Sequence, residues 1–150
     1  MINPHGGSLI DRKMTEQEKA GYNPEDMPSM KLGIEKIKEL ENIANGVFSP
    51  LTGFLCEADF ASVLENMRLD DGTPWPIPIV LDTDDPSIKV GEELALTDND
   101  GKLVAVLDVE DTYSYDKTAM ADAVYGTSDS DHPGVAKILK MKDKLVGGNI

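Results

Sequence analysis

The sequence predicts an α+β domain in which helices accompany a small antiparallel sheet or barrel. Apolar residues recur at helical spacing in residues 34–44 and 57–67, whereas from residue 77 onward they fall in short runs typical of strands. Helical spacing returns in residues 116–124 and again after Pro133. A chain of 150 residues suits one domain, large enough to bury about 70% of the surface that its unfolded state exposes.

The first 33 residues are rich in Pro, Gly and charge, and they predict an irregular arm that Leu9 and Ile10 anchor to the domain. The arm begins with the motif PHGG at residues 4–7. A phosphate-binding loop needs a strand before it, a helix after it, and either Lys-Ser/Thr or a third Gly. Gly6 and Gly7 have none of these, so a simple turn is the preferred interpretation.

Two amphipathic helices are predicted next, over residues 34–44 and 57–67. Each presents one apolar stripe to the core and charged residues to solvent. The first stripe consists of Ile34, Ile37, Leu40, Ile43 and Ala44, and the second of Phe60, Val63, Leu64 and Met67.

The loop between these helices, residues 46–55, reads GVFSPLTGFL and carries many apolar residues. Gly46 and Gly53 can supply the positive φ that tight turns need, and Pro50 fixes φ within a turn. The apolar content predicts that the loop is buried.

A polar turn at residues 70–73 leads into Trp75 and a predicted edge strand at residues 77–81, because Pro76 and Pro78 cannot donate to a strand ladder. Two further strands are expected around residues 94–96 and 103–109.

The tract DNDG at residues 98–101 joins those two strands in a hairpin, since Asn and Gly tolerate positive φ. Gly126 ends the third helix and Pro133 begins the fourth. The tail LVGGNI predicts a last strand and a chain that continues beyond Ile150.

Charge and composition exclude several functions. The chain has 14 basic and 28 acidic residues, a net charge of −14, which repels nucleic-acid backbones and anionic lipid. Only Arg12 and Arg68 offer the guanidinium suited to bidentate oxyanion binding.

A single Cys56 excludes an internal disulfide and suits a buried structural thiol. No signal peptide or membrane span is visible, so the expected compartment is the cytoplasm.

Three acidic clusters raise the possibility of calcium binding: Asp82, Asp84 and Asp85; Asp98 and Asp100; Asp129 and Asp131. None has the EF-hand spacing, so solvated turns are the preferred interpretation.

His132, between Asp131 and Pro133, could serve as a general base oriented by a carboxylate. No nucleophile is spaced for it, since Ser128 and Ser130 are too close in sequence and His5 is the only other imidazole. A structural role at a helix start is therefore favoured. Conventional zinc ligation is disfavoured by two His and one Cys.

Trp75, Tyr113, Tyr115 and Tyr125 could form a base-stacking surface. Their flanking residues are acidic, and such surfaces normally lie in a positive groove, so packing is favoured.

Five motifs in this order resemble the N-terminal domain of ATP sulfurylases, the sulfate adenylyltransferases: PHGG, GVFSPLTGF, RLDDGTPWPIPIVLD, VYGTSDSDHPGV and the closing VGG. The resemblance runs from Pro4 to Gly148, nearly the whole chain, and is poorest over residues 14–33.

The resemblance implies a single PUA-like domain over residues 1–150, a small mixed β-barrel with flanking helices. It implies that the parent enzyme joins sulfate to the α-phosphate of ATP, giving adenosine 5'-phosphosulfate and pyrophosphate, with ATP and Mg²⁺ bound in a separate catalytic domain. The Gln-x-Arg-Asn-Pro and Gly-Arg-Asp-His segments of that catalytic domain have no counterpart here. No catalytic, cofactor-binding or metal-binding residue is therefore assigned to this chain.

The implied partners are the catalytic domain of the same polypeptide and further copies in a homo-oligomer. Two alternatives stay open. A stand-alone PUA-like module could bind RNA, against which the negative charge argues, and a calcium-dependent module could use the acidic clusters. The sequence does not separate an assimilatory from an energy-metabolic role.

Overall fold

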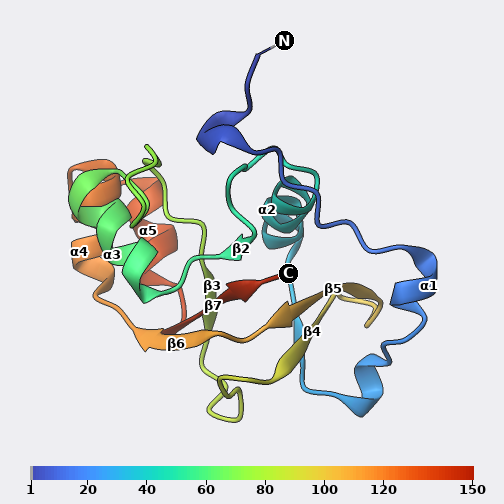
Figure 1. The fold of residues 1–150 in the computed structure, drawn as a ribbon. Helices are drawn as coiled ribbons and strands as arrows, with labels where there is room; N and C mark the ends of the chain where they lie inside the picture. The colour runs from blue at the N-terminus through green and yellow to red at the C-terminus, as the bar shows by residue number, and fades with distance from the viewer. Residues whose placement is uncertain (1) are drawn as a thin grey trace. The chain divides into compact units, whose positions relative to one another are not determined.

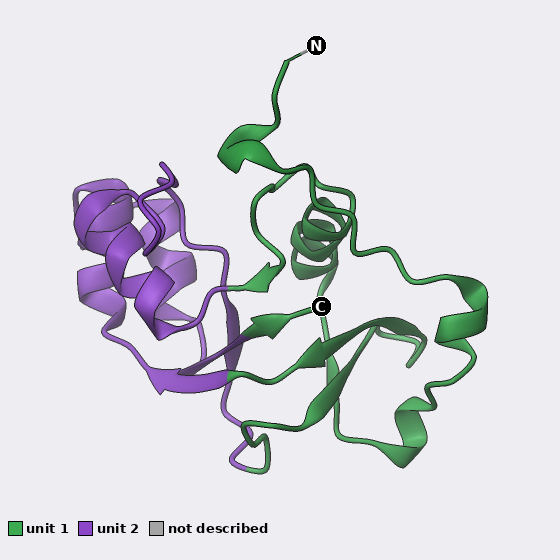
Figure 2. Cartoon of the chain, in the orientation of Figure 1, with its two compact units in different colours: residues 1–54, 87–110, 148–150 green, residues 55–86, 111–147 purple. Residues whose placement is uncertain are grey.

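The computed structural model describes residues 2–150, which form two compact units (Figure 2). Unit 1 comprises the residues up to 54 together with 87–110 and 148–150, and unit 2 comprises residues 55–86 and 111–147. The fold is a mixed α+β one, with helices and sheets. No helix in residues 2–150 has the length and apolar character needed to cross a bilayer.

A three-stranded sheet organises unit 1. Its strands are β1 (Ser29–Lys31), β4 (Glu93–Thr97) and β5 (Leu103–Asp108), in the order β1-β4-β5. Figure 1 shows β4 and β5. β4 and β5 are antiparallel, whereas β1 runs parallel to β4. The predicted hairpin is confirmed, because Gly101 has φ +80° and its N–H donates to the carbonyl of Asp98 at 3.1 Å.

The N-terminal arm contains three short helical segments, η1 (His5–Gly7), α1 (Glu16–Lys19) and η2 (Pro24–Asp26). Two hydrogen bonds secure it to the loop and helix that follow: the N–H of Ile10 donates to the side-chain Oγ of Ser49 at 3.0 Å, and the N–H of Arg12 donates to the carbonyl of Ala44 at 2.9 Å. Leu9 is 71% exposed. Even so, Leu9 Cδ1 would lie 2.8 Å from a Cβ atom on Gly46, and Ile10 is half-buried, so the predicted pair does contact the domain and the hydrogen bonds add to its anchoring.

Helix α2 (Ile34–Ala44) has the predicted bounds. Leu40 and Ile43 are buried, as expected from their spacing, but Ile34 is 65% exposed. Ile34 is the first residue of the helix and follows the N-cap Gly33, so no preceding turn covers it. The apolar stripe reaches the core only in the second half of the helix.

The loop after α2 is largely buried, as predicted, although Val47 is 68% exposed. Gly46 has φ +81°, whereas the φ of Gly53 is not positive. Gly53 belongs instead to strand β2 (Gly53–Phe54), and a Cβ atom there would lie 1.7 Å from the carbonyl oxygen of Gly148. Gly53 is required for close backbone approach rather than for a turn.

Three helices belong to unit 2: α3 (Glu57–Asn66), α4 (Lys117–Tyr125) and α5 (Pro133–Leu139) (Figure 1). All three were predicted. Several of the side chains predicted to face the core are buried: Phe60, Val63, Met120, Val135 and Ile138. In α4, however, Ala121 is buried, whereas the predicted Ala123 and Val124 are only half-buried, and in α5 the predicted Leu139 is 39% exposed. Met67, the left-handed C-cap of α3, is 59% exposed, so the predicted stripe of this helix ends before it.

Strand β7 (Lys144–Asn149) confirms the strand predicted at the tail. In unit 2 it pairs antiparallel with β3 (Leu81–Thr83) and with β6 (Asp111–Ser114). The edge strand predicted at residues 77–81 is thus displaced, because regular pairing begins only at Leu81, where β3 starts. Pro76 and Pro78 lack N–H donors, which explains the irregular approach.

Candidate functional site

His132 caps a helix in this structure. It is the N-cap of α5, and its Nδ1 accepts a hydrogen bond from the N–H of Gly134 at 3.1 Å. Its ring lies against Tyr125 with 4.7 Å between centroids. No carboxylate of residues 2–150 is hydrogen-bonded to this ring. His132 therefore lacks the orienting partner that a general base in a catalytic triad has.

Two of the three predicted acidic clusters close turns, whereas in the remaining one Asp84 lies 3.8 Å from Lys142 Nζ. Asp98 Oδ1 accepts from the backbone N–H groups of Asp100 and Lys102, at 3.0 and 2.9 Å. Asp129 Oδ1 accepts from the N–H of Asp131 at 3.0 Å. Within the described residues, no group of three or more His, Cys, Asp or Glu side chains is placed to hold a metal ion.

The PHGG motif forms a turn at the surface of unit 1. Gly6 has φ +72° and the N–H of Gly7 donates to the carbonyl of Pro4 at 3.0 Å. A Cβ atom on Gly6 would lie 2.6 Å from the ring of Pro50. The motif thus makes a tight turn with close packing, as the sequence predicts.

Among the aromatic residues of unit 2, Phe60, Tyr113 and Tyr115 form a packed cluster, whereas Trp75 is half-buried and Tyr125 is 43% exposed. The ring of Phe60 lies 5.6 Å from that of Tyr113 and 6.1 Å from that of Tyr115, centroid to centroid. Tyr113 is 5% exposed, and its hydroxyl donates to the carbonyl of Leu55 at 2.6 Å. Burial raises the pKa of Tyr113 well above its usual range, and the nearby Cys56 and carboxylates raise it further. These rings build the core rather than an open stacking surface.

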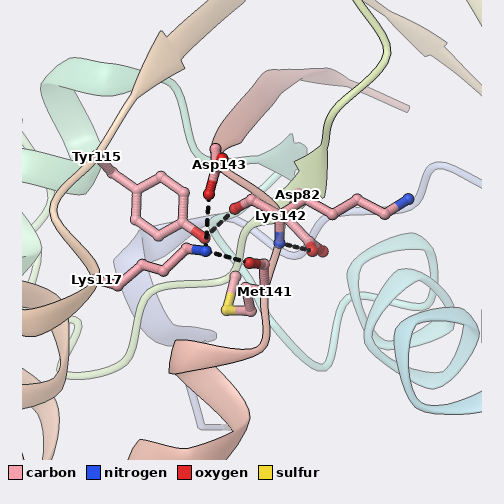
Figure 3. Close-up of polar contacts among 6 residues, drawn as sticks. All are labelled: Asp82, Tyr115, Lys117, Met141, Lys142 and Asp143. Carbon is pink, nitrogen blue, oxygen red and sulfur yellow. Dashed lines mark hydrogen bonds and ion pairs between the residues drawn. The ribbon is translucent and has the colours of Figure 1, made fainter.

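A second polar cluster of unit 2 secures the segment between α5 and β7. Figure 3 shows its members, and we call this set the loop clamp: Asp82, Tyr115, Lys117, Met141, Lys142 and Asp143. The hydroxyl of Tyr115 donates to the carbonyl of Lys142 at 2.5 Å, and the N–H of Lys142 donates to Asp82 Oδ2 at 2.8 Å.

Lys117 completes the loop clamp from the first turn of α4. Its Nζ donates to the carbonyl of Met141 and to Asp143 Oδ1, the latter at 2.9 Å (Figure 3). Burial raises the pKa of Tyr115, and the carboxylates of Asp82 and Asp143 raise it further. A tyrosine kept neutral in this way can donate a hydrogen bond but cannot act as a base near neutral pH. Sequence reasoning did not find this cluster, because its members come from segments up to about 60 residues apart in the chain.

Each unit also has an open cavity. In unit 1, a cavity of about 250 Å³ is lined by Arg12, Lys19, Leu40, Val106 and Ile150, among others. Arg12 Nε donates to the carbonyl of Ile150 at 2.8 Å beside it.

In unit 2, a groove of about 400 Å³ runs along α3 and α4 and includes Ser114 of β6. We call it the α3–α4 groove. Its apolar lining consists of Phe60, Ala61, Leu64, Ala119 and Ala123, and its charged lining of Glu57, Glu65 and Asp116.

The fold and these clusters define a mixed α+β domain in which polar side chains chiefly cap helices, close turns and secure loops. The family model described as a PUA-like domain matches residues 2–150. The chain therefore belongs to the PUA-like domain family.

Curated relatives extend the comparison. The chain is 47% identical to a sulfate adenylyltransferase of Cenarchaeum symbiosum, over 99% of this chain and 38% of the relative. It is 44% identical to that of Thermococcus onnurineus, over 98% of this chain and 39% of the relative. The chain thus spans about two fifths of the length of the curated relatives it matches.

A solved structure, the hexameric APS kinase from Thiobacillus denitrificans, is similar with a TM-score of 0.72 and 29% identity. The match covers 99% of this chain and 26% of that one. The same fold thus occurs as a minor part of a longer polypeptide.

Proposed function

We propose that this chain is the noncatalytic N-terminal domain of a sulfate adenylyltransferase, which converts ATP and sulfate to adenosine 5'-phosphosulfate and pyrophosphate. The supporting observation is the extent of similarity. Nearly all of this chain aligns with the enzymes, yet it accounts for only 38–39% of two of them. The remaining three fifths of such a protein has room for a catalytic domain.

The charge of the chain also supports a catalytic site that lies outside these 150 residues. ATP and sulfate are anions, and their transfer reaction needs positive or hydrogen-bonding groups around a crowded anionic transition state. The net charge of this chain is −14 and it contains two arginines, Arg12 and Arg68. ATP and Mg²⁺ are therefore assigned to the catalytic domain, and this chain contributes no catalytic residue.

The same proposal includes the closure of the sheet, the domain organisation, the oligomeric state and the compartment of the enzyme. The strands would close into the small mixed barrel implied by the resemblance, residues 1–150 would act as one domain of the enzyme, and the whole protein would be a cytoplasmic homo-oligomer. Its partners would be the catalytic domain of the same polypeptide and further copies of the enzyme, with neither nucleic acid nor membrane.

The proposal is tested by pyrophosphate release from ATP, measured side by side on this chain and on the gene product read beyond Ile150. Reactions without sulfate are the control. We expect sulfate-dependent release only from the longer protein. Release by the 150-residue chain would contradict a noncatalytic role, and His132 would then be the first residue to substitute. No release from either protein would contradict the assigned enzyme activity.

A further inference from the structure

The lining of the α3–α4 groove is apolar apart from Ser114 and three carboxylates, which we call the rim, and it contains no basic residue. Phe60 is buried and Leu64 half-buried, while Ala61 and Ala119 are exposed. The rim carboxylates are those of Glu57, Glu65 and Asp116.

No Lys, Arg or His of residues 2–150 forms an ion pair with any of these three carboxylates. Only Asp116 has a protein partner for its side chain, since it caps α4 by accepting from the N–H of Ala119 at 3.0 Å. No basic side chain of residues 2–150 thus neutralises these carboxylates, although the N-termini of α3 and α4 offset part of the charge of Glu57 and Asp116. A ligand with positive charge and an apolar face would complement this groove.

The distance between the rim carboxylates indicates how the positive charges of the ligand should be spaced. Glu57 and Glu65 are eight residues apart on α3, about 12 Å or two helical turns. Ala61 lies midway between them on the same face. Small side chains let a second helix approach closely, within the usual separation of about 8–10 Å between axes. A helix lying along α3 would meet both carboxylates with basic residues seven or eight positions apart.

We propose that the α3–α4 groove docks a basic amphipathic helix of the catalytic domain in the same polypeptide. This inference rests on the proposed function. A domain that binds ATP and sulfate must concentrate positive charge, which complements a groove whose charged groups are all acidic.

A helix from a second copy of this chain does not fit the groove. The described helices α1 to α5 contain no pair of basic residues at the required spacing, since the only helix with two, α2, carries them at Lys36 and Lys38.

The experiment measures how fast thiols placed in the groove react with a maleimide. Ala61→Cys and Ala119→Cys are each made in the 150-residue chain and in the longer protein. Site-resolved mass spectrometry separates their labelling from that of the native Cys56. Ala58→Cys is the matched control, because Ala58 is also exposed on α3 but does not line the groove.

We expect Ala61→Cys and Ala119→Cys to be labelled about tenfold or more slowly in the longer protein, with Ala58→Cys labelled equally in both. Equal labelling at the groove positions would overturn the proposal. If the longer protein releases pyrophosphate while its groove is labelled freely, the docking surface is wrong and the proposed function stands. Protection of the groove without any activity would instead overturn the proposed function.

Charge complementarity is tested separately by Glu57→Gln with Glu65→Gln in the longer protein carrying Ala61→Cys. We expect faster labelling of Ala61→Cys, because the basic helix loses its ionic partners. Asp122→Asn, at an exposed position of α4 that does not line the groove, should leave the labelling rate unchanged. Unchanged protection in the double variant would overturn the assignment of a basic helix.

Discussion

At the scale of single residues, side chains of types that often act in catalysis form hydrogen bonds to backbone groups in this structure. His132 accepts from the N–H of Gly134, Asp98 closes its own turn, and Tyr113 donates to the carbonyl of Leu55. Each of these hydrogen bonds satisfies a backbone group that would otherwise need water. Residue types that often signal catalysis thus have structural roles in this chain.

Tyr113 gives the clearest test of such a role. Tyr113→Phe removes the donor to the carbonyl of Leu55, which lies in a buried segment. We expect the free energy of unfolding at pH 7 to fall by about 1–2 kcal/mol. Urea denaturation measures it. Tyr125→Phe, at a tyrosine that is 43% exposed, is the control and should change stability little. Equal stabilities of Tyr113→Phe and the wild type would contradict the structural role.

The raised pKa of Tyr113 also predicts an alkaline limit to stability. An unfolded tyrosine ionises near pH 10, whereas burial keeps the folded hydroxyl protonated to higher pH. The contribution of the buried Tyr113 hydroxyl to the free energy of unfolding is complete below about pH 10. It is lost as pH rises above that value, because the tyrosine then releases its proton in the unfolded state before it does so in the folded state.

The free energy of unfolding should therefore fall from about pH 10 upward, and less steeply in Tyr113→Phe. Denaturation series at several pH values measure both slopes. Identical slopes would mean that Tyr113 is not the responsible group, and Tyr115, whose pKa is also raised, would be substituted next.

At the scale of elements, the sequence predicts helices better than strands. The apolar spacing over residues 34–44 predicted α2 where the structure has it, because the 3.6-residue period and the breakers around it are local signals. Strands β1 and β6 were not predicted. Ser29 and Lys31 of β1 are exposed, and only pairing with β4, some 66 residues away, makes the segment a strand. The loop clamp was missed for the same reason.

Gly53 shows how a local reading can identify the right residue for the wrong reason. The sequence marked it as a turn glycine, but its partner Gly148 lies 95 residues further on. Gly53→Ala places a Cβ atom against the carbonyl oxygen of Gly148 at 1.7 Å, where backbone rather than a flexible side chain must move.

We expect Gly53→Ala to lose several kcal/mol of stability or to fail to fold. Gly33→Ala is the matched control, since its Cβ atom would meet nothing within 4 Å, and it should cost less than about 1 kcal/mol. Thermal unfolding followed by circular dichroism compares the two. A Gly53→Ala protein as stable as Gly33→Ala would refute the close approach of β2 to β7.

At the scale of the whole molecule, charge is the dominant feature. A net charge of −14 over 150 residues destabilises the folded state through self-repulsion. The ion pairs of the described residues relieve little of this repulsion, because most of their side chains are exposed. In the proposed enzyme, the same charge would keep anionic substrates away from this domain and would favour its attachment to positively charged surfaces of the catalytic domain.

Self-repulsion predicts that salt stabilises this chain. The Debye length falls from about 30 Å at 0.01 M salt to about 8 Å at 0.15 M, so the melting temperature should rise by a few degrees over that range. Thermal scans in sodium chloride measure the rise, and choline chloride at equal ionic strength should reproduce it, because screening depends on charge and not on the identity of the cation. Calcium chloride at matched ionic strength should add nothing further. A calcium-specific rise would instead favour a calcium-dependent module built on the acidic turns, and no rise in any salt would show that repulsion among these carboxylates does not limit stability.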